Sequence, residues 1–291
     1  MRLVLGTAQF GMDYGLSNNN GKTNIDEVSR IIKYACQNGI SLLDSAPSYG
    51  DAEIVLGNVV HNNNIRYVLK TPQFENTHIS SLNASTLRDS FFKSLSDIKK
   101  ENAYGLIMHS CNDLLKSGGR LLFKEMESLK SNGFVEKIGV SVYESWQINE
   151  ITEKYNIDLI QIPFNIFDQR LLLNDSLKKL KQKNIEIHAR SIFLQGLLLM
   201  PIDSISNYFL PIRSKLQMID KVADNLSISK LDMLLSFALS IKEIDQIIVG
   251  VNKLSQLKEI IDAHIIQINP DNFLNFSIDD PNFINPSKWK L

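Results

Sequence analysis

Cysteine is scarce in this sequence, and no long hydrophobic run occurs in it. The two cysteines, Cys36 and Cys111, cannot form a disulfide framework or a zinc site of the usual spacing, so a reducing compartment is expected. We interpret both as small buried hydrophobic side chains rather than reactive thiols. No stretch approaches the roughly 18 to 20 apolar residues of a membrane-spanning helix, and the first residues show no signal-peptide pattern. The sequence therefore predicts a soluble cytoplasmic protein without a membrane segment.

An excess of charge of one sign is also absent. The 31 basic and 32 acidic residues give a formal net charge of −1, which excludes a global field for nucleic acid or an anionic membrane. With 44% hydrophobic and 22% charged residues, the composition is that of a globular protein, which excludes disorder, collagen and coiled coil. No linker or charge block divides the 291 residues, and no heptad repeat indicates an oligomeric state. We therefore expect a single domain over residues 1–291.

Short apolar runs alternate with amphipathic stretches along most of the chain. Eight such runs, each followed by a helical pattern, predict a parallel sheet closed into a (β/α)₈ barrel, with an open doubly wound sheet as the alternative. The predicted strands are 2–7, 40–46, 66–71, 103–110, 134–142, 158–165, 185–191 and 245–251. The predicted helices are 25–38, a helix starting near residue 51, 84–99, 119–132, 145–155, 168–183, 229–241 and 253–264.

Two segments depart from this alternation. Residues 192–228 form a longer connection than a barrel usually has and contain Pro201 and Pro211, so we expect them to pass over the top of the barrel as a cover for substrate or cofactor. The tail, residues 268–291, is rich in proline and asparagine and lacks a helical period. It is expected to run across the surface.

Polar side chains end three consecutive strands of the predicted barrel. Asp44 ends the second strand, Lys70 the third and His109 the fourth. Tyr49 lies in the loop that follows Asp44. Each alone has an ordinary structural explanation, such as a helix cap for the aspartate or a solvent-reaching stem for the lysine. Because a barrel of this kind carries its chemistry at the carboxyl ends of its strands, we expect all four at one rim.

Together the four side chains favour general-acid chemistry on a carbonyl group. A phenol with an ordinary pKa near 10 is a weak acid at neutral pH, but a nearby ammonium favours the phenolate and makes Tyr49 a better proton donor. A carboxylate beside Lys70 holds it charged and in place. A histidine that donates a hydrogen bond orients the carbonyl or shares the proton transfer.

This constellation, in this order, resembles the aldo/keto reductase superfamily. The resemblance implies a single (β/α)₈ TIM barrel with Asp44, Tyr49, Lys70 and His109 as catalytic residues. It also implies reversible hydride transfer between NADPH and a carbonyl or alcohol, without a metal. The matching segments follow the family's order: LGTAQFG at 5–11, LLDSAPSYG at 42–50, VLKT at 68–71, LIMHS at 106–110, IGVSVYE at 138–144, IQIPFNIFDQR at 160–170, RSIFLQGLL at 190–198 and IIVGVNKLSQLKE at 247–259.

The residues that follow the last strand predict a phosphate-binding site independently of the resemblance. Gly250 permits a tight turn into a helix whose start holds Asn252 and Lys253, so free backbone N–H groups, the helix dipole and an ammonium would point at one place. A plain turn with a solvated lysine is the alternative. The resemblance places Lys253 near the adenosine 2′-phosphate and Gln256 beside the adenine, which favours NADPH over NADH.

The resemblance assigns the remaining cofactor contacts to strand ends. Gly6 and Thr7 match the family's cofactor contacts at the first strand. The segment that holds the pyrophosphate is matched by Ser191, Leu194 and Gly196. Ser141 and Gln161 match residues that hold the nicotinamide carboxamide.

Three positions depart from the family's pattern. Val142 stands where many members have asparagine, so one carboxamide hydrogen bond is absent or comes from Asn165. Ile260 stands where an asparagine often contacts adenine. Arg190 stands where an aromatic ring often stacks on nicotinamide. Its planar guanidinium could stack there or bind an anionic substrate group.

The substrate class rests on resemblance alone. Segments 163–171 and 190–201 resemble a branch associated with bacterial sugar and surface-polysaccharide metabolism, which favours a sugar-derived carbonyl, free or linked to a nucleotide. Two other functions stay open. One is a barrel that binds NADPH as a sensor with little turnover. The other is a metal-free lyase or isomerase that uses Lys70 as a Schiff-base amine, with the phosphate loop holding substrate.

Overall fold

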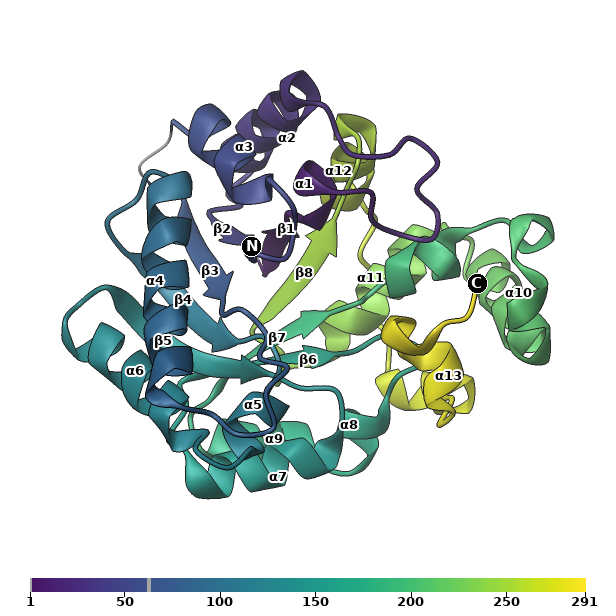
Figure 1. Ribbon diagram of the computed structural model, residues 1–291. Helices are drawn as coiled ribbons and strands as arrows, with labels where there is room; N and C mark the ends of the chain where they lie inside the picture. Colours follow the sequence, from purple (N-terminus) through teal and green to yellow (C-terminus); the bar gives the residue numbers. More distant parts are fainter. Residues whose placement is uncertain (1, 62–63) are drawn as a thin grey trace.

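Parallel strands close into a barrel in the computed structural model, which describes residues 2–61 and 64–291 (Figure 1). Each strand pairs with the next, and the first pairs with the last through Gly6 opposite Gly250. The barrel prediction is therefore confirmed, and the open-sheet alternative is wrong. The strands are β1 (Leu3–Gly6), β2 (Leu42–Asp44), β3 (Arg66–Lys70), β4 (Ala103–Met108), β5 (Val135–Ser141), β6 (Leu159–Pro163), β7 (Glu186–Arg190) and β8 (Gln246–Gly250).

Helices surround the barrel close to the predicted positions. The prediction of one helix over 168–183 is wrong, because the chain reverses at Asp175, whose φ of 58° lies in the left-handed region. Two short helices, α1 (Ala8–Gly11) and α5 (Asn112–Leu115), were not predicted. The others are α2 (Ile25–Gln37), α3 (Ala52–Val59), α4 (Ser81–Asp97), α6 (Arg120–Ser131), α7 (Ser145–Lys154), α8 (Arg170–Leu173), α9 (Ser176–Gln182), α11 (Lys230–Ser240) and α12 (Leu254–Ile261). No helix within the described ranges is long and apolar enough to cross a membrane.

Helix α2 shows how the sequence fixes these boundaries. The Asn24 side chain accepts a hydrogen bond from the Glu27 backbone N–H at 2.9 Å, which caps an otherwise unsatisfied donor. Val28 and Ile31, three residues apart, are fully buried on the face that packs inward. Gly39, with φ of 79°, ends the helix.

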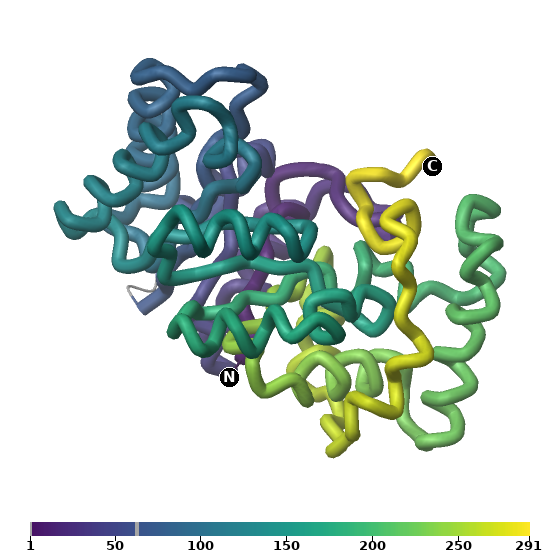
Figure 2. Tube along the Cα trace, turned by 90° about the horizontal axis from the view of Figure 1, so that it is seen from below, coloured from purple at the N-terminus to yellow at the C-terminus, as the bar shows by residue number. Residues whose placement is uncertain are grey.

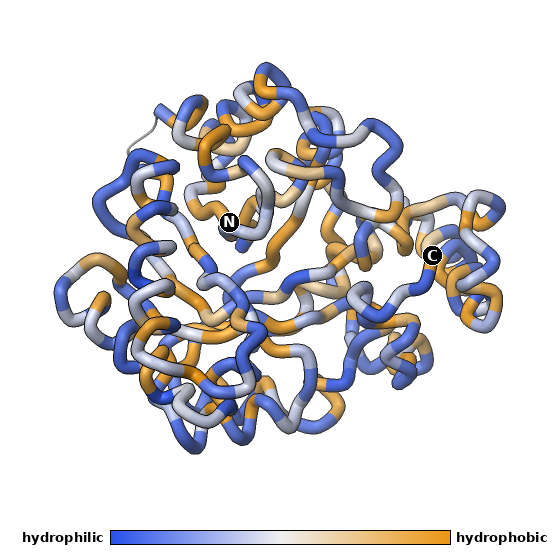
Figure 3. Tube along the Cα trace, in the orientation of Figure 1, coloured by the Kyte–Doolittle hydropathy of each residue, from blue (hydrophilic) through white to orange (hydrophobic). Residues whose placement is uncertain are grey.

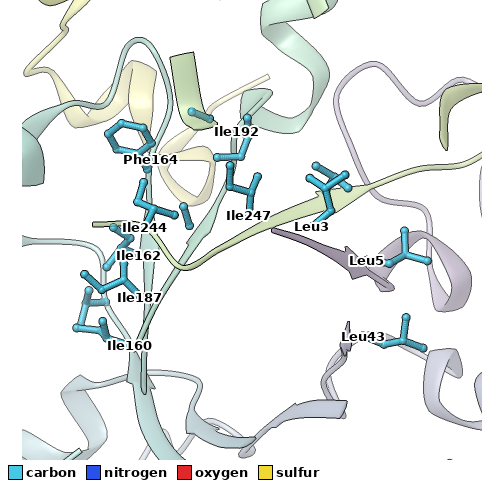
Figure 4. Packing of buried hydrophobic residues seen from close by; sticks show 14 of the residues in the cluster. Leu3, Leu5, Leu43, Ile160, Ile162, Phe164, Ile187, Ile192, Ile244 and Ile247 are labelled. Carbon is cyan, nitrogen blue, oxygen red and sulfur yellow. The ribbon is translucent and has the colours of Figure 1, made fainter. Parts of the chain in front are cut away.

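The apolar core has two layers. The larger lies between the strands and the helices, where Ile160, Ile162 and Ile187 of adjacent strands group together (Figure 4). Figure 3 shows the same division as largely hydrophobic strands inside helices that alternate between hydrophobic and hydrophilic residues. The smaller layer fills the barrel itself and consists of Val4, Leu42, Val68, Ile107, Leu159 and Ile248. The barrel is therefore packed below its mouth, and a ligand enters only from the carboxyl ends of the strands.

A charged cluster closes the opposite end of the barrel. Glu186, the first residue of β7, accepts hydrogen bonds from Tyr104 Oη at 2.6 Å and from Lys137 Nζ, and its other oxygen lies 2.7 Å from His188 Nε2. Arg66 covers the Tyr104 ring at 4.3 Å. Burial raises the pKa of Glu186, but its hydrogen bonds with His188, Lys137 and Tyr104 lower it by more, to about 2.

We expect Glu186→Gln to destabilise the fold. The lowered carboxyl pKa means that the ionised group stabilises the native state, and solvent screening at this partly exposed site reduces the effect to about 2 kcal/mol. This contribution is complete above the ordinary pKa of about 4.5 and is lost as the pH falls toward about 2. The free energy of unfolding in urea at pH 7 and at stepwise lower pH measures it.

A matched control for this variant is Glu136→Gln. Glu136 is exposed and faces Arg66 at 3.8 Å, so its removal should change the free energy of unfolding by less than about 0.5 kcal/mol. An equal loss of unfolding free energy in the two variants would contradict the stabilising role of the cluster. So would a difference between wild type and Glu186→Gln that does not become smaller below pH 4.5.

The long connection and the tail form a wall beside the barrel mouth. Tyr208 Oη donates to the Asn282 carbonyl at 2.8 Å, and the rings of Phe209 and Trp289 meet edge to face at 5.0 Å. Figure 2 shows the two segments side by side. The connection contains η1 (Leu194–Leu199), η2 (Ile202–Ser204), η3 (Asn207–Ile212) and α10 (Arg213–Asn225), and the tail contains η4 (Pro270–Phe276), α13 (Pro281–Ile284) and η5 (Pro286–Lys288).

The expectation of a tail without helices is therefore wrong. It missed the apolar residues among the prolines and asparagines: Phe273, Phe276 and Ile284 are buried and anchor the short helical turns.

Candidate active site

Asp44, Lys70 and His109, which end neighbouring strands, meet Tyr49 of the following loop at the barrel mouth. Lys70 forms a buried ion pair with Asp44 and donates a hydrogen bond to Tyr49 Oη at 3.1 Å. The His109 ring lies edge to face with the Tyr49 ring, with centroids 6.2 Å apart. Parallel pairing explains the convergence, because β2, β3 and β4 are neighbours and end at the same edge.

Asp44 is held from several sides. Its second carboxylate oxygen accepts a hydrogen bond from Gln161 Nε2 at 2.8 Å, and its backbone carbonyl accepts one from Thr7 Oγ1 at 2.9 Å. The carboxylate is thus fixed in position to hold Lys70. The resemblance assigned Gln161 and Thr7 to the cofactor. In this structure both side chains also position the aspartate.

Burial dominates the acidity of Tyr49. It raises the pKa of the phenol, and although Lys70 acts in the opposite direction, the net shift is upward. The pKa of Lys70 is lowered by burial but raised by more by Asp44 and Tyr49, so the ammonium persists at neutral pH. Lys70 thus favours the phenolate as expected, but burial outweighs it, so Tyr49 holds its proton.

His109 is neutral at physiological pH. Burial and the charge of Lys70 lower the imidazole pKa to about 4. Its backbone N–H bonds Thr71 Oγ1 at 3.2 Å, and its buried Nδ1 has no hydrogen-bond partner within the described part of the chain. A neutral imidazole can orient a carbonyl but is a poor source of a proton.

A cavity of about 1170 Å³ opens above these residues and extends past the ends of β7 and β8 to α12. Two predicted site residues are not among those that line it: Leu194 is buried, and Lys253 is exposed at the start of α12. The predicted residues that do line it are Gly6, Thr7, Asp44, Tyr49, Lys70, His109, Ser141, Gln161, Arg190, Ser191, Gly196, Gly250, Asn252 and Gln256.

Segments that are remote in sequence meet around the cavity mouth. Gly196 has φ of 89°, and a Cβ there would lie 1.9 Å from Ser17 Oγ, so this close approach requires glycine. The Ser17 backbone N–H donates to the Gln195 carbonyl at 3.4 Å. Residues of the long connection between Ile192 and Ser206 therefore line one side of the cavity, and Asn285–Ser287 of the tail extend this lining. The sequence analysis missed this part of the tail.

The start of α12 is capped by the protein's own side chains. The backbone N–H groups of Asn252 and Lys253 donate to Gln256 Oε1 at 2.7 and 3.1 Å. That of Leu254 donates to Glu27 Oε1 at 2.6 Å. The expectation of free N–H groups there is therefore wrong. Gln256 lies one helical turn after the N–H groups that it caps. Glu27 belongs to α2, so only folding brings its carboxylate to the start of α12.

The cavity fits an elongated polar ligand such as a nicotinamide dinucleotide. Two buried polar atoms without partners among the described residues belong to side chains that line it, His109 Nδ1 near Lys70 and Asn252 Nδ2 beyond β8. Ser141 and Ser191 lie between these ends. Buried groups of this kind are satisfied when a ligand with polar groups at both ends binds.

Comparison with known proteins agrees with the barrel and its motifs. Two solved structures resemble it in fold. One is an aldo-keto reductase from Bacillus halodurans in its holo form, with 16% identity, a TM-score of 0.76, and 99% and 95% of the two chains covered. The other is a glycerol dehydrogenase from Gluconobacter oxydans, with 21% identity, a TM-score of 0.71, and 98% and 94% covered. No curated protein matches the chain. The aldo/keto reductase family matches residues 2–276, and the chain belongs to that family.

Proposed function

We propose that this protein reduces an aldehyde or ketone to the alcohol with NADPH, and that Tyr49 is the general acid. The observation that supports this role is the contact of Lys70 with both Asp44 and Tyr49 in a buried corner of the cavity. A bound nicotinamide dinucleotide supplies the hydride for such a reduction.

The residues divide the proton chemistry between them. The Tyr49 phenol donates its proton to the carbonyl oxygen, and the adjacent Lys70 ammonium stabilises the phenolate that remains. Asp44 keeps the ammonium in place. Neutral His109 donates a hydrogen bond that orients the carbonyl beside Tyr49.

The Schiff-base alternative requires Lys70 as a free amine. The ion pair with Asp44 and the raised pKa of Lys70 both oppose this state. The sensor alternative needs no proton donor, so it leaves the arrangement of Tyr49 and Lys70 unexplained. Reduction accounts for both.

Titration of the protein with NADPH and NADH, followed by cofactor fluorescence, is the first test of the proposal. Saturable binding, then loss of NADPH absorbance with sugar-derived aldehydes and ketones, is expected. Binding without turnover on any carbonyl would favour the sensor. No nucleotide binding, together with borohydride trapping of substrate on Lys70, would favour the lyase.

NADPH is the proposed donor because of Lys253. This exposed ammonium adjoins Asn252 of the cavity wall and makes no ion pair within the described residues, so it can reach a 2′-phosphate. Glu27 is an opposing charge at the same helix end.

The two charges predict opposite effects on NADPH. Lys253→Ala should weaken NADPH binding about fivefold to tenfold and leave NADH within about twofold. Glu27→Gln should tighten NADPH binding by about threefold at most, because Arg30 pairs with Glu27 at 2.6 Å and already offsets much of its charge, while the side chain can still cap Leu254. Fluorescence titrations at low and high salt measure both, and the differences should shrink as salt rises. Equal effects on NADPH and NADH would show that neither side chain senses the phosphate.

A sugar-derived carbonyl, free or linked to a nucleotide, is the proposed substrate class, and the cytoplasm the proposed location. Polar groups from different segments surround the mouth, among them Ser48, Tyr14 and Ser287, which suit hydroxylated substrates.

A further inference from the structure

Among the residues that the structure describes, Arg190 is the cavity-lining cation that forms no ion pair with a carboxylate. Of the basic residues in the cavity wall, Lys70 pairs with Asp44, and Lys230 pairs with Asp220 at 2.8 Å. Arg190 makes no ion pair within the ranges that the structure describes. Its hydrogen bonds go to neutral oxygens only, the Val142 carbonyl at 3.2 Å and Ser191 Oγ at 3.4 Å.

The guanidinium lies over an aromatic ring. Arg190 ends β7, and its guanidinium carbon lies 4.3 Å from the centre of the Tyr143 ring. This stacking orients the fork without using up its N–H donors. Stacking on Tyr143 also differs from the nicotinamide stacking that the resemblance suggested.

The charge acts on the catalytic corner. Burial, then Lys70, are the main causes of the lowered pKa of His109, and Arg190 contributes in the same direction. Arg190 also lowers the pKa of Tyr14, which burial raises, so its field reaches both sides of the cavity. A partly buried guanidinium costs desolvation free energy that a paired anion offsets.

We propose that the substrate carries a carboxylate or phosphate group, and that Arg190 binds it while Tyr49 and His109 face the carbonyl. This inference rests on the proposed carbonyl reduction. The planar fork of arginine matches the paired oxygens of either anion, which gives orientation as well as attraction. An acidic sugar or a sugar phosphate has the required chemistry.

The experiment compares substrates that differ only in charge. Glucuronate against glucuronamide tests a carboxylate, and glyceraldehyde 3-phosphate against glyceraldehyde tests a phosphate. In the wild-type protein, kcat/KM should favour the anionic member of at least one pair by about 30-fold to 100-fold. The pair that shows the preference identifies the anion. Equal kcat/KM within both pairs would overturn the inference.

Three variants separate substrate binding from other roles of Arg190. Arg190→Gln should reduce the preference to about twofold, chiefly by raising KM for the anionic member of the pair. Arg190→Lys, which keeps the charge but not the fork, should retain part of the preference. Arg213→Gln, at the half-buried start of α10, is the control for loss of one positive charge and should retain all of the preference. A weakened NADPH Kd in Arg190→Gln with the preference intact would assign the guanidinium to the cofactor and overturn the inference.

A binding measurement keeps this inference distinct from the proposed reduction. Calorimetry with glycerol 3-phosphate against glycerol, and with gluconate against gluconamide, needs no turnover. Anion binding that Arg190→Gln abolishes would support the inference even if no carbonyl were reduced. Turnover of neutral carbonyls without any anion binding would support reduction alone.

Discussion

Replacing Tyr49 with phenylalanine should lower kcat for carbonyl reduction by about three orders of magnitude, because the variant lacks the proton donor. The ring keeps its edge-to-face contact with His109, and only the hydroxyl that Lys70 contacts is lost. NADPH affinity should therefore stay within about twofold. Steady-state kinetics and a fluorescence titration of the same preparation measure the two quantities.

Tyr143→Phe is the matched control for this variant. Tyr143 also lines the cavity but does not contact Lys70, so its loss should lower kcat by less than about tenfold. Near-native turnover of Tyr49→Phe would remove Tyr49 from the role of acid. The Schiff-base chemistry would be favoured if Lys70→Ala lost more activity than Tyr49→Phe and borohydride trapped substrate on Lys70 of the wild-type protein.

Lys70→Met should impair both turnover and stability. The phenolate loses its stabilising ammonium, so kcat should fall by about two orders of magnitude or more. Asp44 loses its cationic partner while the side chain is only 5% exposed, and an unpaired buried carboxylate costs about 3 to 5 kcal/mol. Denaturant unfolding and steady-state kinetics at a temperature where the variant is folded give both values.

The double variant Asp44→Asn with Lys70→Met separates the two effects. Neutralising Asp44 removes the unpaired charge, so the double variant should regain about half of the lost stability. It should not regain activity, since the ammonium is still absent. Recovery of turnover together with stability would show that Lys70 acts only by holding the fold together.

The barrel could be predicted because its evidence is local. Each strand contains a short apolar run such as residues 67–69, and each main helix repeats a periodic apolar stripe such as that of α2. The prediction of one helix over 168–183 failed because the apolar period continues past Asn174 and Asp175. These are residue types that readily adopt the left-handed region, as Asp175 does. Similarly, the tail's isolated phenylalanines show no period, and only the wall that they pack against explains them.

The candidate site was predictable to the extent that strand order fixes position. Asp44, Lys70 and His109 end neighbouring strands, so parallel pairing alone brings them together. The pKa direction of Tyr49 was not predictable, since it depends on how deeply other segments bury the phenol. Nor was the Glu27 cap at α12, whose two partners are 227 residues apart in the chain.

The segments that form the cavity mouth should fold later and open more easily than the barrel. The loop around Ser17, the turn at Gln195 and Asn285–Ser287 are far apart in the sequence, whereas Asp44, Lys70 and His109 end adjacent strands. Contacts of high sequence separation form late, and surface segments open at lower free energy than a packed barrel. At mild denaturant concentrations the mouth should therefore open while the barrel stays native, and substrate discrimination should fade before the secondary structure does.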